Sequence, residues 1–351
     1  MNKKKIKTGS DFSGVGAFDQ ALMMLGIDYE TVFACDMDKY ARQTYLHNYG
    51  EPKYYPENVY NREIPKDSLD IFMTSPPCQA FSLAGKRLGK DDKRGILFFN
   101  SHEFIQENKP RFFIFENVKG LLSDDNGKTF SEWINLLGGK SVNGLPIIFP
   151  YEDSVHYHIY WKVLNAKDYN IPQNRERIFI IGIRDDADNV FSWPIEEPLT
   201  RKLKDVLESE VDEKYFLSEK MVSYLTENSQ KQQQNGNGFK FSTVENSETA
   251  KAITTKPGQR MDDNFLKIKS ATSKGYELAT ENDSINFTHP NSKTRRGRVG
   301  VGVGQTLDTA CNQAVIDEGK IRRLTPRECF RLMDFPESFS WPVSDSQAYK
   351  Q

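Results

Sequence analysis

The sequence predicts an α/β protein with a mostly parallel β-sheet and a second, smaller and irregular region. Two observations lead to this prediction: strand-like and helix-like segments alternate up to about residue 186, and polar sequence without clear helices follows. Alternation of this kind is typical of parallel sheets covered by helices. The chain has 351 residues and is long enough to bury a sizeable core. Its net charge is -2, so any nucleic-acid contact would need positive charge that is concentrated locally.

The strands are predicted from short, nearly continuous apolar runs, which suit strands buried on both faces. These runs lie at 29–35, 69–74, 111–115, 156–164 and 177–183. Helices are predicted where apolar side chains recur at spacings of three and four residues. Two such stripes are Phe18, Ala21, Leu22 and Leu25 before Gly26, and Phe130, Trp133, Ile134 and Leu137. A later helix is predicted to begin after Thr325, since Pro326 and Glu328 complete a helix-start pattern.

The region behind the first sheet pattern is polar and locally basic. Residues 228–238 are rich in Gln, Asn and Gly and predict a flexible connector. Residues 240–305 contain eleven Lys and Arg against seven Asp and Glu, most densely around Arg295, Arg296 and Arg298. A solvated charged loop and a nucleic-acid contact both explain such a run.

A glycine-containing turn precedes the first predicted helix. Gly14 and Gly16 allow close approach of a ligand to the backbone, and the helix start offers free N–H groups. Asp36 ends the next strand, where an acid can accept the ribose hydroxyls of a nucleoside. Asp19 stands where a dinucleotide-binding turn has its third glycine, and its charge opposes a pyrophosphate. A nucleoside cofactor without phosphates, such as S-adenosylmethionine, fits better than NAD.

Chemically active side chains lie at the ends of several predicted strands. Cys78 lies on a loop behind Pro76 and Pro77, and Glu116 ends the apolar run at 111–115. Arg175 and Arg177 stand at the start of another strand. Alone, Cys78 reads as a small buried hydrophobe and Glu116 as a structurally satisfied acid. Together they predict a thiol, an acid and a guanidinium at one sheet edge.

Five segments carry a more specific signal: "DFSGVGAF", "PPCQAFS", "FENVKG", "IPQNRERIFIIGIR" and "RRLTPRECFRLMDFPESF". In content and order they resemble the motifs of the cytosine-C5 DNA methyltransferase family. The resemblance implies a Rossmann-like S-adenosylmethionine-dependent methyltransferase domain, with the smaller irregular region as a target recognition domain. It implies a catalytic and cofactor-binding domain at 1–186, the recognition domain at 187–320, and a return segment at 321–351.

The resemblance also implies a mechanism. Cys78 adds to C6 of a flipped-out cytosine in duplex DNA, which makes C5 nucleophilic toward the methyl group. Glu116 in its acid form assists at N3, while Arg175, with Arg177 beside it, holds the ring and favours the thiolate. The products are 5-methylcytosine in DNA and S-adenosylhomocysteine, and no metal is required.

Binding residues are implied position by position. The cofactor is expected to contact Phe12, Ser13, Gly14, Val15, Gly16, Phe18, Asp36, Met37, Asn58 and Pro76. Two of these depart from the family, which more often has Glu at position 36 and an acid at position 58. DNA is expected to contact Gln79, Ser82, Arg295, Arg296, Arg298 and Thr306.

The family's Gly-Asn-Ser segment and last helix do not follow Gln351. We expect a trimmed chain, a split enzyme completed by a second chain, or a degenerate copy. A bacterial or phage-like enzyme of a restriction-modification system would work in the cytoplasm, beside a cognate endonuclease and away from membranes. Two alternatives are a tRNA cytosine-C5 methyltransferase of the same superfamily, and a non-catalytic DNA-binding subunit of a split enzyme.

Overall fold

The computed structural model describes residues 5–77, 96–218, 220–222, 266–290, 292–317 and 320–351. Its helices are α1 (Ala17–Met24), α2 (Lys39–Tyr49), α3 (Ile96–Asn108), α4 (Lys128–Leu137), α7 (Pro326–Leu332) and α8 (Asp345–Ala348), with 3₁₀-helices η2 (Lys119–Gly127), η3 (Ala166–Asp168), η4 (Leu203–Val206) and η5 (Glu213–Tyr215). Its strands are β1 (Ile6–Asp11), β2 (Tyr29–Cys35), β3 (Ile71–Thr74), β4 (Phe112–Val118), β5 (Gly139–Val142), β6 (Leu145–Pro146), β7 (Tyr157–Asn165), β8 (Glu176–Arg184), β9 (Leu266–Lys269), β10 (Tyr276–Ala279), β11 (Ser284–Asn286), β12 (Val299–Gly300), β13 (Gln313–Asp317) and β14 (Lys320–Arg323).

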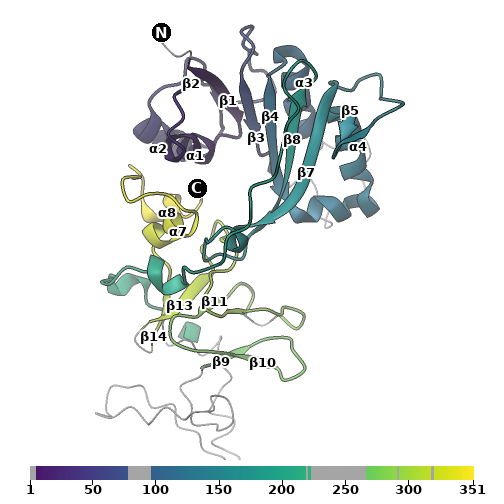
Figure 1. The fold of residues 1–351 in the computed structure, drawn as a ribbon. Helices are drawn as coiled ribbons and strands as arrows, with labels where there is room; N and C mark the ends of the chain where they lie inside the picture. The colour runs from purple at the N-terminus through teal and green to yellow at the C-terminus, as the bar shows by residue number, and fades with distance from the viewer. Residues whose placement is uncertain (1–4, 78–95, 219, 223–265, 291, 318–319) are drawn as a thin grey trace, which may run out of the picture.

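The largest sheet of the described residues has the strand order β2-β1-β3-β4-β8-β7-β5-β6 (Figure 1). Strands β2, β1, β3 and β4 are parallel, which confirms the predicted α/β class. β8 is antiparallel to both β4 and β7. The connection from β7 to β8 contains only the short η3, whereas a parallel pair needs a longer crossover connection, usually a helix.

The core of the larger part lies between this sheet and the helices α3 and α4. Phe113 and Phe115 of β4 are fully buried and cluster with Phe98 of α3 and Trp133 of α4. The rings of Phe98 and Trp133 stack with 4.1 Å between their centroids. Both predicted helices form, and α4 buries its apolar stripe. In α1 the buried residues are Asp19, Gln20 and Leu22, and Leu25 of the predicted stripe is 72% exposed.

β1 was absent from the sequence prediction, although it lies in the middle of the parallel strands. Its residues Thr8, Ser10 and Asp11 are buried, so the strand carries no continuous apolar run. Gly9 is required by packing: a Cβ there would lie 2.6 Å from Leu69 Cδ1. A polar strand with a glycine at its centre has no sequence signature that distinguishes it from a loop.

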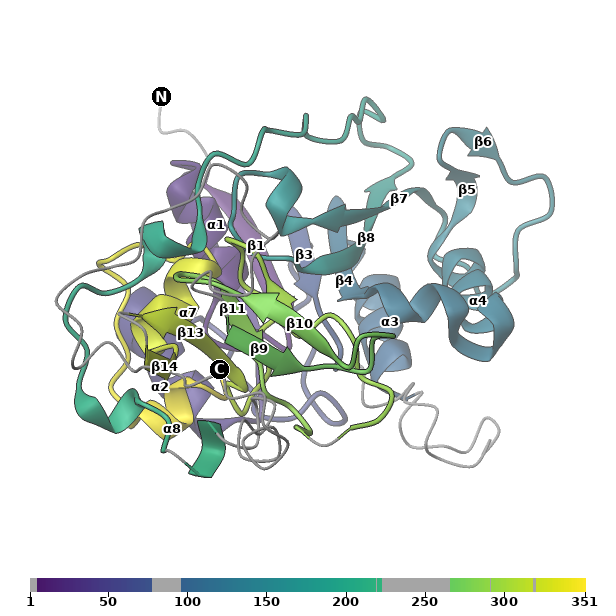
Figure 2. The same ribbon diagram turned by 90° about the horizontal axis from the view of Figure 1, so that it is seen from below.

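The smaller part contains two antiparallel sheets, β10-β9 and β12-β11-β13-β14. It has its own apolar cluster, which includes Ile268, Ile285, Ala314 and Ile321. In Figure 1 these strands lie below the larger sheet, and in Figure 2, which is seen from below, they lie in front of part of it. The predicted connector at 228–238 lies outside the described residues, and the predicted domain boundaries stay predictions.

The C-terminal segment packs against the start of the chain. Phe330 and Phe339 cluster with Val15, next to the glycine turn, and with Ala41 of α2. Asn48 of α2 donates a hydrogen bond to the carbonyl of Ser340 at 2.8 Å. Figure 1 shows α7 and α8 between α2 and the smaller sheets. In the described part of the chain, no helix combines the length and apolar character that a membrane crossing requires.

α7 begins as predicted from its sequence. Thr325 Oγ1 accepts a hydrogen bond from the backbone N–H of Glu328, and the Glu328 carboxylate accepts one from the backbone N–H of Thr325. Glu328 also forms an ion pair with Arg322 at 2.8 Å, and neither side chain is exposed. The helix start is therefore anchored to β14 as well as capped.

Candidate active site

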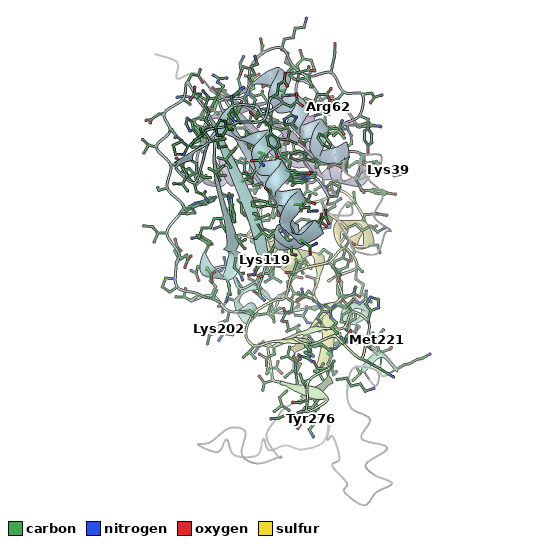
Figure 3. All side chains as sticks on the ribbon, turned by 90° about the vertical axis from the view of Figure 1, so that its right-hand side faces the viewer. Lys39, Arg62, Lys119, Lys202, Met221 and Tyr276 are labelled. Carbon is green, nitrogen blue, oxygen red and sulfur yellow. The ribbon has the colours of Figure 1, made fainter. Side chains whose placement is uncertain are left out.

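An acidic side chain and two arginines meet where β4 ends and β8 begins. Because these strands are antiparallel, Arg177 near the start of β8 pairs with Val118 at the end of β4. Arg177 Nε lies 2.9 Å from Glu116 Oε1, and the two side chains are 17% and 21% exposed. Lys119, one residue after β4, is labelled in Figure 3 at the end of the larger part that faces the smaller sheets. The predicted acid and arginines are thus brought together there.

Burial and charge act in opposite directions on Glu116. Burial raises the pKa of its carboxyl group, and this effect exceeds the lowering by Arg177 and Arg175. Burial, and then the positive charge of Arg177, lowers the pKa of Arg175 to about 10, while Glu116 acts to raise it. A carboxyl group with a raised pKa keeps more of its acid form near neutral pH. Glu116 is therefore suited to donate a proton or a strong hydrogen bond.

The loop that carries the predicted nucleophile leaves β3 beside this group. Asn117 Nδ2 donates to the carbonyl of Pro76 at 3.2 Å, and Pro76 is buried. Asn117, next to Glu116, therefore holds the start of the loop that leads from β3 to Cys78. Cys78, Gln79 and Ser82 lie outside the described residues, so their roles stay predictions.

The glycine turn lies between β1 and α1 and is held by Asp36. Asp36 Oδ2 accepts a hydrogen bond from the backbone N–H of Gly14 at 2.8 Å. Gly14 has a φ of +53°, and a Cβ at that position would meet nothing within 4 Å. Gly16 has a φ of +86°, and a Cβ there would lie 2.2 Å from the Tyr49 ring. Only glycine satisfies both requirements at position 16.

The end of β2 offers acceptors and an exposed apolar side chain. Asp36 Oδ1 accepts from the backbone N–H of Asp38 at 2.8 Å. Each carboxylate oxygen therefore has one backbone partner and keeps a free lone pair for a hydroxyl group. Burial raises the pKa of Asp36 despite these two hydrogen bonds. Met37 beside it is 85% exposed and available to an aromatic ring.

Comparison with known proteins identifies the kind of site. The model of the family described as C-5 cytosine-specific DNA methylase matches residues 6–351. The chain belongs to this family. The enzyme is therefore a DNA cytosine-C5 methyltransferase, and the predicted family is confirmed.

Two relatives match the sequence of this chain over most of their own length. The methyltransferase is 32% identical over 432 residues to the orphan methyltransferase M.SPRI of Bacillus phage SPR, covering 99% of this chain and 93% of that protein. It is 33% identical over 346 residues to the type II methyltransferase M.HpaII of Haemophilus parainfluenzae, covering 97% and 82%. Because these names include both orphan and type II enzymes, the predicted cognate endonuclease stays a prediction.

Solved structures support the fold of the methyltransferase. The S. pombe Dnmt2 methyltransferase has a TM-score of 0.56 at 18% identity, covering 99% of this chain and 92% of that chain. The Entamoeba histolytica methyltransferase EhMeth has a TM-score of 0.58 at 16% identity, covering 99% and 92%. Likeness at this level of identity concerns the fold.

The smaller part of the methyltransferase contacts the segment directly before Arg175. Thr306 Oγ1 donates to the carbonyl of Asn174 at 2.8 Å, one residue before Arg175. The backbone N–H of Gly304 donates to the carbonyl of Pro172 at 2.7 Å. Gln173, between these contacts, is fully buried, and neither polar atom of its amide has a hydrogen-bond partner in the described structure. The predicted DNA contact Thr306 is thus placed beside the predicted catalytic arginine.

The three predicted DNA-binding arginines fall into two groups. Arg296 is exposed, and its Nε donates to the carbonyl of Ala271 at 2.9 Å. Arg295 is half-buried. Arg298 differs, since it is 1% exposed and its guanidinium donates to backbone carbonyls. Those carbonyls belong to Asn286, Thr288 and His289. Arg298 therefore holds the backbone that precedes the basic loop (residues 293–298), and its side chain is not placed to reach DNA.

This difference predicts distinct outcomes for two substitutions. Arg296→Ala should remove an exposed cation and lower the salt dependence of DNA binding by about one charge. Arg298→Lys should lower the free energy of unfolding by about 1.5–3 kcal/mol, because lysine cannot bond three carbonyls in a fixed fork. Fluorescence anisotropy at several salt concentrations and thermal unfolding separate these effects. Weaker DNA binding with unchanged unfolding for Arg298→Lys would contradict the assignment of Arg298 to the backbone.

The role predicted for Asn58 stays a prediction, and one pair was missed. Asn58 lies on an exposed loop, where its Oδ1 accepts from the backbone N–H of Tyr60 at 2.9 Å. The missed pair is Asp11 with Arg62, a buried ion pair between β1 and this loop. The partners are 51 positions apart in the chain, a separation that carries no spacing signal. The only available hint was an acid at the end of β1, directly before the glycine turn.

Proposed function

We propose that the enzyme transfers a methyl group from S-adenosylmethionine to C5 of a flipped-out cytosine through a covalent Cys78–C6 adduct. The observation that carries the proposal is the convergence of Glu116, Arg175 and Arg177 beside the start of the Cys78 loop. The family establishes the reaction on DNA, and this arrangement supports the covalent route.

The residues around the glycine turn fit S-adenosylmethionine. Open space at Gly14 admits the methionine part of the cofactor, with Phe12, Ser13, Val15, Gly16 and Phe18 around it. The free lone pairs of Asp36 suit the ribose hydroxyls, and the exposed Met37 suits the adenine face. Asn58 offers an amide to the adenine edge, and Pro76 borders the reacting end. When bound, the cofactor supplies an electrophilic sulfonium methyl group.

The protein side chains perform the rest of the chemistry. The Cys78 thiolate forms an S–C6 bond, and the electrons of the C5–C6 double bond move through the ring toward N3. Glu116 donates its proton or a strong hydrogen bond to N3, while the guanidinium of Arg175 holds the O2 side of the ring. After methylation a base removes the C5 proton. The C5–C6 double bond re-forms as the thiolate leaves, and the N3 proton returns to Glu116.

Access to C5 requires the base to leave the duplex stack, so the DNA backbone must be held. Arg295 and Arg296 on the basic loop and Thr306 beside Arg175 are the described residues proposed for this role. Gln79 and Ser82 are proposed to join them from the Cys78 loop. S-adenosylhomocysteine and methylated double-stranded DNA leave as products. Relatives with curated names are methyltransferases of bacteria and phages, which favours DNA over tRNA as the substrate.

One assay tests the proposed function. The enzyme is incubated with S-adenosylmethionine labelled in its methyl group and either duplex DNA or tRNA. We expect label in DNA, cytosines protected from bisulfite conversion at one short sequence, and formation of S-adenosylhomocysteine. Label in tRNA alone would assign the tRNA reaction, and no transfer to either would favour a DNA-binding subunit.

A further inference from the structure

The loop that carries Asn58 is held by two arginines, one on each side. Residues 52–65 form no helix, and much of the segment is exposed, including Tyr60 at 56%. On one side, Arg42 of α2 donates to the carbonyls of Tyr55 and Pro56, both at 2.9 Å. On the other side, Arg62 turns inward, and its side chain is 1% exposed. Asn58 lies between the two anchors.

Arg62 joins this loop to two elements of the larger sheet region. Its Nη2 donates to Asp11 Oδ2 and to the carbonyl of Asn100 in α3, both at 2.8 Å. Its Nη1 donates to the carbonyl of Val59 within the loop. The guanidinium also lies over the Phe104 ring, 5.3 Å from its centroid. Figure 3 shows Arg62 in the α/β part, far from Tyr276 of the smaller sheets.

Asp11, the acidic partner of Arg62, lies next to the glycine turn and to the strands that lead to Asp36 and Pro76. It is the last residue of β1, fully buried, and Phe12 of the glycine turn follows it. Its strand neighbours are Cys35, directly before Asp36, and Thr74. Beside the carboxylate lies Ser101 of α3, whose hydroxyl is 2.8 Å from Thr74 Oγ1 at the end of β3. The ion pair thus sits where the glycine turn, the Asn58 loop and the strand before Pro76 meet.

We propose that Asp11 and Arg62 are positioning residues that fix the Asn58 loop relative to the glycine turn, and so set the shape of the cofactor site. This inference rests on the proposed use of S-adenosylmethionine. A buried ion pair adds little stability compared with apolar residues of similar size, but its hydrogen bonds are directional. An arginine fork can hold an acid and two carbonyls in one geometry, which a lysine cannot.

Two variants separate positioning from simple stabilisation. Arg62→Lys keeps the positive charge and loses the fork. The double variant Asp11→Leu with Arg62→Met removes both charges and fills the space with apolar atoms. Such replacements are often neutral or stabilising, so the double variant is expected to unfold near the temperature of the unchanged enzyme. Arg298→Lys is the matched control, since Arg298 is also buried, donates to three backbone carbonyls and belongs to the smaller part, away from the glycine turn.

Binding of S-adenosylhomocysteine is measured by isothermal titration calorimetry, together with thermal unfolding. We expect Kd to rise about tenfold or more in Arg62→Lys and in the double variant. The control should lower the unfolding temperature while its Kd stays within about twofold of the unchanged enzyme. The KM for S-adenosylmethionine should rise in parallel with Kd, while the KM for DNA stays unchanged.

The outcomes distinguish this inference from the proposed function. If the unchanged enzyme binds the cofactor product but both variants bind it equally well, the positioning role is overturned and the proposed function stands. An equal loss of affinity in Arg298→Lys would also overturn it, because any buried arginine would then have the same effect. Absence of binding by the unchanged enzyme overturns both.

Discussion

Cys78→Ser should abolish methyl transfer to DNA, with a loss of at least about 1000-fold, as is typical when the nucleophile of a covalent mechanism is removed. A serine hydroxyl is almost entirely protonated near neutral pH and needs an adjacent base to act as a nucleophile. A thiol is partly ionised there, and a nearby guanidinium such as that of Arg175 favours the thiolate. Transfer of labelled methyl groups to duplex DNA measures the effect.

A trapping experiment shows whether the loss concerns the covalent step. Duplex DNA with 5-fluorocytosine at the target position cannot lose a proton from C5 after methylation, so the adduct should accumulate. The unchanged enzyme is expected to give a protein–DNA band under denaturing conditions, and Cys78→Ser none. Cys311→Ser is the control, because Cys311 is a buried free thiol 3.6 Å from Cys329. A trapped adduct in Cys78→Ser would rule out Cys78 as the nucleophile.

Glu116→Gln should lower kcat by about 100-fold to 10,000-fold, the usual contribution of a positioned general acid. Glutamine has nearly the same shape and can still bond the ring nitrogen, but it cannot transfer a proton. Because burial raises the pKa of Glu116, its acid form persists to higher pH than that of an ordinary glutamate. The kcat of the unchanged enzyme should therefore fall as pH rises through this raised pKa.

The pH profile distinguishes a proton donor from a structural acid. In Glu116→Gln the alkaline limb assigned to Glu116 should vanish, and the low rate should stay flat over that range. Glu176→Gln is the control, since Glu176 is on the adjacent strand, 44% exposed, and pairs with Lys119. It should retain kcat within about twofold, because exposed ion pairs contribute little. A Glu116→Gln enzyme with the full pH profile would exclude Glu116 as the acid.

Most of the fold was predictable where each element contains its own signal. β2 and α4 bury apolar residues at strand and helix spacings, and α7 begins with a complete capping box. β1 could not be predicted in the same way. Its buried side chains are polar, and it becomes a strand because β2 and β3 pair with it on both sides.

The candidate site was predictable to a similar extent. Glu116, Arg175 and Arg177 end or begin recognisable strands, so their meeting follows from the order of motifs and the antiparallel pairing of β4 with β8. The role of Arg298 did not follow, because its position in a basic run says nothing about its burial. Thr306 was expected at DNA, but its contact with the Asn174 carbonyl depends on how the smaller part packs.

The amino-acid sequence by itself determined the α/β class and the family and predicted the residues of the site, because these depend on local patterns and on motifs in order. Only the tertiary structure decided which buried charges support the site. Asp11 and Arg62 are distant in the chain and meet because a surface loop folds back onto the end of β1. Such a pairing depends on the free energy of the whole fold, since each charge would be costly to bury without the other.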